Sequence, residues 1–185
     1  MSYLITLNYS WKITFNCYCN CLRFLFLFFC FWGTQLFADQ HVLEQESFEA
    51  WQFACVEEQS QKLCDLRELV FDSNTNEVVS YLSITINPDE LTQMQIAFPH
   101  AVNLKSPVQL QIDDKDPLEL GYAYCNQSAC FIAEIIAENF VNMFKDGNQI
   151  TLKVLLLDNR EATITYSLAG FTAGYSRLSS AVLSN

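Results

Sequence analysis

Apolar and polar side chains alternate at every second position in three stretches of the chain, at 82–86, 108–112 and 162–168. Successive side chains of an extended strand point to opposite faces of a sheet. A period of two is therefore typical of a strand with one face in the core. Weaker strand patterns are found at 51–56, 64–71, 93–98, 118–124, 130–135 and 149–157.

Turn-forming residues separate these stretches where the chain must reverse direction. Asp, Asn, Ser and Pro are frequent in turns because their short side chains or fixed φ angles favour reversal. They cluster at 72–76, 87–89, 113–117, 126–128 and 158–159. Eight or nine short strands with such turns predict a mainly β protein, an antiparallel two-sheet β-sandwich.

Two stretches show a helical period instead. Ile136, Phe140, Met143 and Phe144 recur at helical spacing before Gly147, which predicts a short helix over 136–147. A second, weaker helical pattern covers 171–180. The Met and Phe stripe is interpreted as core rather than as a ligand groove.

The first 38 residues have a composition of their own. They contain no Asp or Glu, and their apolar run at 24–32 follows Lys12 and Arg23 and precedes the segment that ends at Ala38. This order predicts a signal peptide at 1–38 and a single domain at 39–185. A membrane anchor is the alternative, although a span needs roughly 20 apolar residues. The long stretch before Arg23 leaves a downstream start codon open.

Charge is divided unequally between the two parts. All 21 acidic residues but only 8 of the 10 basic ones follow residue 38, so residues 39–185 have a formal net charge of −13. Such a field repels nucleic acid and anionic lipid, so we expect no nucleic acid partner. We also expect no stable membrane insertion after leader removal. A protein partner with positive charge is permitted, although the acidity can also serve solubility alone.

The cysteines indicate an oxidising compartment, periplasmic or extracellular. Four lie in the predicted leader, and the even number that follows it predicts two disulfides. Three pairings are possible, and short turns between predicted strands favour Cys55 with Cys64 and Cys125 with Cys130. Their spacing fits neither a Cys-x-x-Cys redox motif nor a zinc site, so we expect no metal and no cofactor.

Candidate catalytic groups are few. Only His41 and His100 follow the leader, and no nucleophile elbow, phosphate loop or zinc-protease motif is present. His100 is interpreted as a surface residue. Asp113, Asp114 and Asp116 crowd one turn but lack the order of a calcium loop. A pair of carboxylates brought together in space would still permit a hydrolase.

Several short motifs, taken in order, resemble the invasion-associated locus B family. They are Trp51-x-x-x-Cys55 with Cys64, the segment 107–113, Tyr122-Ala-Tyr-Cys125 with Cys130 and Ala133, Gly147, and Ser167-Leu-Ala-Gly-Phe-Thr-Ala173. The sequence departs from the family pattern at His100-Ala101-Val102 and at Ala129. The resemblance implies an exported protein of Gram-negative bacteria with an immunoglobulin-like β-sandwich, associated in some members with entry into host cells. It implies no catalytic residues.

The sequence therefore predicts an exported, non-enzymatic protein that acts in host-cell invasion or host interaction through surface binding. A periplasmic accessory or chaperone-like module of an envelope complex is one alternative. A hydrolase that uses carboxylates is the other.

Overall fold

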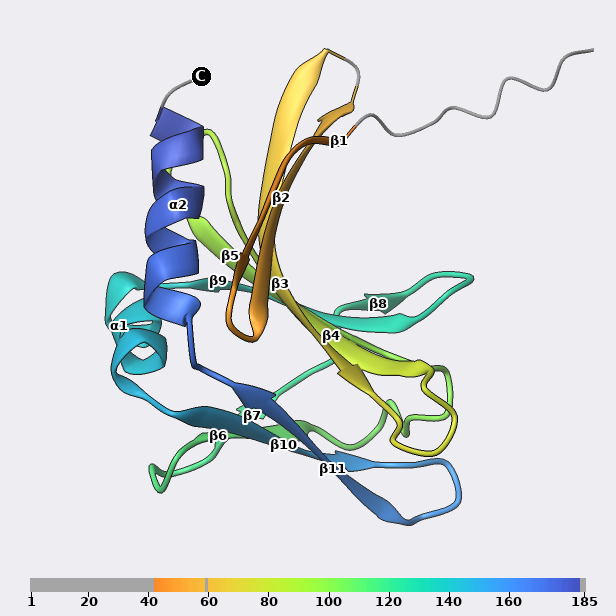
Figure 1. Cartoon of the computed structure of the whole chain (residues 1–185). Helices are drawn as coiled ribbons and strands as arrows, with labels where there is room; N and C mark the ends of the chain where they lie inside the picture. Colours follow the sequence, from red (N-terminus) through yellow and green to blue (C-terminus); the bar gives the residue numbers. More distant parts are fainter. Residues whose placement is uncertain (1–41, 59, 184–185) are drawn as a thin grey trace, which may run out of the picture. The chain divides into compact units, whose positions relative to one another are not determined.

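The computed structural model describes residues 42–58 and 60–183 (Figure 1). The predicted leader at 1–38, its cleavage point and His41 lie outside the described residues. In chain order, the strands are β1 Val42–Phe48, β2 Trp51–Glu58, β3 Gln61–Phe71, β4 Val78–Ile86, β5 Thr92–Phe98, β6 Val108–Ile112, β7 Leu118–Leu120, β8 Tyr124–Cys125, β9 Cys130–Ile136, β10 Gln149–Leu155 and β11 Glu161–Ser167. The helices are α1 Glu138–Asp146 and α2 Phe171–Leu183.

The strands form two antiparallel sheets. The large sheet has the order β1-β2-β3-β4-β5-β9-β8, and the small sheet has the order β11-β10-β6-β7. Strands β1 to β5 follow one another in both sequence and space, so each joins the next by a hairpin. The predicted mainly β, two-sheet architecture with two helices is confirmed.

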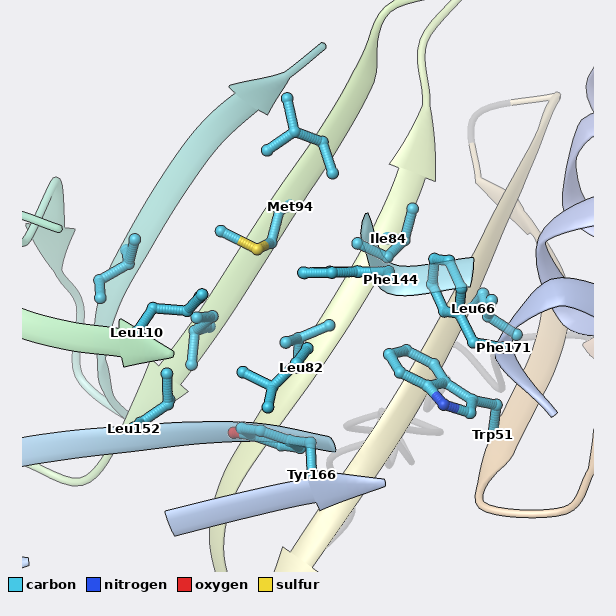
Figure 2. Close-up of a cluster of buried hydrophobic side chains, with 14 of the residues drawn as sticks. Trp51, Leu66, Leu82, Ile84, Met94, Leu110, Phe144, Leu152, Tyr166 and Phe171 are labelled. Atoms are coloured by element: carbon cyan, nitrogen blue, oxygen red, sulfur yellow. The ribbon is translucent and has the colours of Figure 1, made fainter. Parts of the chain in front are cut away.

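The core lies between the two sheets and the helices (Figure 2). Leu82, Ile84 and Met94 of the large sheet are fully buried, as is Leu152 of the small sheet. Each such side chain contributes about 1.5 to 3 kcal/mol when it leaves water. The alternation seen in the sequence therefore marks the inward side of each sheet.

Both helices bury aromatic side chains against this core. Phe144 of α1 and Phe171 of α2 are fully buried and meet edge to face, with ring centroids 5.4 Å apart. The described helices include none that is long and apolar enough to cross a membrane. Helix α1 begins after Ala137 rather than at Ile136, because Ile136 is still paired in β9.

Gly147 follows α1, as predicted, but it is needed for space rather than for a left-handed conformation. Its φ is −86°, which any residue adopts. A Cβ added there would lie 2.8 Å from Leu168 Cδ1 and 2.9 Å from Ile112 Cγ2. The glycine therefore allows α1 to end close to side chains of the small sheet.

Two strand predictions need correction. The predicted strand at 118–124 is two strands, because β7 pairs with β6 in the small sheet and β8 pairs with β9 in the large one. Residues 121–123 cross between the sheets. Strand β1 was not predicted, since its inward positions Glu44 and Glu46 are charged and break the apolar alternation.

Residues from the two ends of the family motif meet in one place. The Trp51 indole Nε1 donates a hydrogen bond of 2.8 Å to the Ser167 carbonyl oxygen, and the Trp51 ring lies edge-on to Phe171 at 5.0 Å. Gly170 has a φ of +85°, and a Cβ there would collide with the Phe48 carbonyl. These residues fasten the start of α2 to β1 and β2.

Candidate functional site

One face of the large sheet, termed here the outer face, points away from the core. The helices and the small sheet contact the alternate residues, such as Phe53, Leu66 and Ser80. In the part of the chain that the structure describes, no helix or second sheet covers the outer face. Its central residues on β2 to β5 and β9 are Gln52, Ala54, Asp65, Arg67, Leu69, Tyr81, Ser83, Thr85, Gln93, Gln95, Ala97, Phe131 and Ala133.

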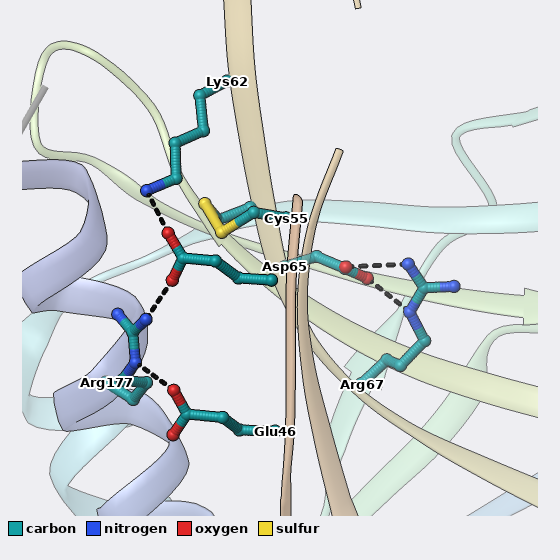
Figure 3. Close-up of a disulfide and its surroundings, with 8 residues drawn as sticks. Glu46, Cys55, Lys62, Asp65, Arg67 and Arg177 are labelled. Atoms are coloured by element: carbon teal, nitrogen blue, oxygen red, sulfur yellow. Dashed lines mark hydrogen bonds and ion pairs between the residues drawn. A yellow bond between two sulfur atoms is a disulfide. The ribbon is translucent and has the colours of Figure 1, made fainter. Parts of the chain in front are cut away.

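The charge of this central outer face is balanced. Asp65 and Arg67 are its charged members, and they form a two-pronged ion pair, with Nε–Oδ2 at 2.6 Å and Nη2–Oδ1 at 2.7 Å. Figure 3 shows this pair on the side of the sheet away from α2. The hydrogen bond to Asp65 raises the pKa of Arg67. In a chain of net charge −11, this is a neutral patch.

The sheet is hollowed around the ion pair. A depression of about 220 Å³ is lined by Asp65, Arg67, Leu69, Tyr81, Ser83, Thr85 and Gln95. Because register pairs Arg67 with Ser83 and Ser83 with Gln95, these side chains form one row across three strands. We call this depression the Asp65–Arg67 hollow. Burial raises the pKa of Tyr81 on its wall.

Aromatic rings border the hollow on the β8 side. Tyr124 stacks on Phe131, with centroids 4.8 Å apart, and Phe131 meets Tyr81 edge-on at 6.5 Å. The Gln95 amide Nε2 donates a hydrogen bond of 2.7 Å to the Tyr124 hydroxyl. The stacking and this hydrogen bond hold the Tyr124 ring in position. Tyr124 is nevertheless 47% exposed to solvent.

On the inner side, charged residues fasten α2 to the edge of the sheet (Figure 3). Arg177 pairs with Glu44 and with Glu46 of β1, and Lys62 pairs with Glu44 at 2.9 Å. The hydrogen bond from Lys62 contributes most to lowering the pKa of Glu44. The Arg177 guanidinium also lies 4.5 Å above the Phe53 ring. This cluster stabilises the packing of α2 against β1 and β2.

The favoured cysteine pairs are the ones that the structure brings together. Cys55 faces Cys64 across β2 and β3, and Cys125 faces Cys130 across β8 and β9, both as disulfides. The turn before Cys130 is closed by the Asn126 side chain, which accepts hydrogen bonds from the Ser128 and Ala129 amides. The Ala129 departure therefore leaves a regular turn.

The histidine and aspartate candidates, His100 and Asp113, both lie in turns. His100 is exposed, and its Nε2 lies 2.8 Å from the Asn126 carbonyl oxygen. Asp113 accepts hydrogen bonds from the Asn148 and Gln149 amides, so it fixes the start of β10. Among residues 42–58 and 60–183, no three His, Cys, Asp or Glu side chains gather in a way that could hold a metal ion.

One buried carboxyl, Glu68, was missed by sequence reasoning. It lies on the inner face of β3, where its Oε1 accepts a hydrogen bond of 3.0 Å from the Ser167 amide and its Oε2 has no partner. Burial raises the pKa of Glu68 to about 7. Its neighbour Tyr166 bonds to Ser80, whose hydroxyl donates to the Ala97 carbonyl.

The fold and these side chains define a disulfide-linked β-sandwich protein with a neutral sheet face that no element of residues 42–58 and 60–183 covers. The chain belongs to the invasion associated locus B (IalB) protein family, whose model matches residues 51–179. The resemblance inferred from the motifs is thus confirmed. Among solved structures, the chain is similar to invasion associated protein B from Bartonella henselae. The two share 22% identity and a TM-score of 0.66, over 74% of this chain and 95% of that one.

This structural likeness supports the β-sandwich fold. No curated protein matches the chain in sequence. The family description names an association with invasion and names no reaction. The outer face itself was not predicted as a site, although its signal was in the sequence. Polar residues such as Gln93, Gln95, Ser83 and Thr85 occupy the alternate positions of two adjacent predicted strands.

Proposed function

We propose that this chain is an exported, non-enzymatic protein that acts in host-cell invasion through surface binding. The observation that carries the proposal is the outer face, a broad area of sheet that no described element covers. A mixed polar and aromatic surface that is not needed for the core is typical of a binding surface. Family membership supports the invasion role, and two disulfides fit an oxidising compartment.

The binding of processed protein to host cells tests this proposal. Protein recovered after export would be labelled and added to cultured mammalian cells, with unlabelled protein as competitor. We expect saturable binding that the variant Arg67→Gln weakens. The matched control is Arg160→Gln, because Asp158 and Arg160 form an exposed pair with the same spacing outside the outer face, Nε–Oδ2 2.7 Å.

Two results would oppose the proposal. Binding that both substitutions weaken equally would show that overall charge, not the outer face, matters. Absence of cell binding, together with retention in the periplasm on a bacterial partner, would instead support the accessory module of an envelope complex.

A further inference from the structure

The Asp65–Arg67 hollow offers hydrogen-bond donors and acceptors without net charge. The Asp65 carboxylate accepts, the Arg67 guanidinium donates, and the ion pair holds both in place. The hydroxyls of Ser83 and Thr85, which also line the hollow, make no hydrogen bond within the described residues. A ligand that carries several neutral hydroxyl groups could use all of these groups at once.

The aromatic border supplies a second kind of contact. One face of the Tyr124 ring lies against Phe131, and the residue as a whole is 47% exposed to solvent. The hydrogen bond from Gln95 holds this ring next to the row of side chains formed by Arg67, Ser83 and Gln95. A flat, apolar ring face beside directional polar groups suits a molecule with both an apolar C–H face and a hydroxyl edge.

We propose that the outer face binds a neutral oligosaccharide, with a sugar ring on Tyr124 and its hydroxyls on Asp65, Arg67 and Gln95. This proposal rests on the proposed function and names the class of its partner. Anionic glycans fit less well, because the chain carries a net charge of −11. An apolar peptide also fits less well, because Leu69 is the one aliphatic residue in the wall of the hollow.

The test is a titration of ¹⁵N-labelled processed protein, followed by NMR amide shifts. The probes are chitohexaose, cellohexaose, maltohexaose and lacto-N-neotetraose, with 3′-sialyllactose as the anionic comparison. We expect at least one neutral probe to shift amides on β3, β4, β5 and β8. Arg67→Gln should weaken binding roughly tenfold, the value of one good charge-assisted hydrogen bond. Tyr124→Ala should weaken it by a similar factor of roughly ten, because it removes the aromatic ring face. Arg160→Gln should leave the affinity within about twofold of the original.

The outcomes separate this proposal from the broader one. If no neutral probe shifts the outer-face amides, or if the shifts lie elsewhere, the oligosaccharide proposal is overturned. Cell binding that persists after enzymatic removal of cell-surface glycans would overturn it as well, while leaving the surface-binding function intact. Sedimentation velocity on the same samples tests the rival occupant. A dimer that Arg67→Gln dissociates would show that a second copy of the chain covers the face.

Discussion

At the scale of single residues, Glu68 stands out because its burial opposes its charge. A carboxyl that leaves water retains its proton to higher pH, since the neutral form loses less hydration. One oxygen of Glu68 has the Ser167 amide as its partner and the other has none. The folded protein therefore binds this proton more tightly than the unfolded chain does.

The variant Glu68→Gln should be more stable than the original protein above neutral pH. The pKa of Glu68 is about 7 in the fold and near 4.5 when exposed, so its ionisation lowers the free energy of unfolding progressively from pH 4.5 to 7. The loss is at most roughly 3 kcal/mol. Urea denaturation at pH 5 and pH 8 measures this, with the exposed Glu119→Gln as control. An unchanged pH dependence in Glu68→Gln would contradict it.

At the scale of elements, the entry into α2 depends on Gly170. Its positive φ and its approach to the Phe48 carbonyl leave no room for a side chain. The next residue, Phe171, packs on Trp51. A change at this turn therefore alters how the last helix meets the first two strands.

Gly170→Ala should destabilise the fold by more than about 1 to 2 kcal/mol, the usual cost of a left-handed non-glycine residue, because the collision with Phe48 adds to it. Gly121→Ala is the control, since nothing lies within 4 Å of a Cβ there. It should change stability by less than about 1 kcal/mol. Urea midpoints of the two variants give the comparison, and equal midpoints would refute the account.

Strands that bury an apolar face could be predicted from the sequence. A strand that is held by ion pairs to other parts of the chain could not. The strand at 108–112 is predicted and observed with the same bounds, because its alternate residues are buried. Strand β1 lacks this signal, since its inward Glu44 is held by Lys62 and Arg177 from distant parts of the chain. The polar positions of the outer face are visible in single strands, but no local pattern specifies which strands become neighbours and so bring these positions together.

At the scale of the molecule, the disulfides should be fully formed in the exported protein. Protein purified from its own bacterium with free thiols blocked should begin at Asp39, carry no blocking group and gain about 4 Da on reduction. Removing either pair should cost about 2 to 3 kcal/mol, since each closes a short loop. Blocked thiols at these positions, or an intact leader, would contradict the predicted export.

The contact between the two ends of the described chain governs when the protein can finish folding. Trp51 bonds to a carbonyl 116 residues later, and Arg177 reaches Glu46 across 131 residues. The hairpins from β1 to β5 join strands that are neighbours in sequence, so these strands can pair as soon as they have been synthesised. Their inner face becomes buried only when α2 packs against it. Folding of this domain is thus completed only after α2 has been delivered. A chain cut short before residue 171 would present Trp51 and Phe53 to other chains, and it would aggregate rather than mature.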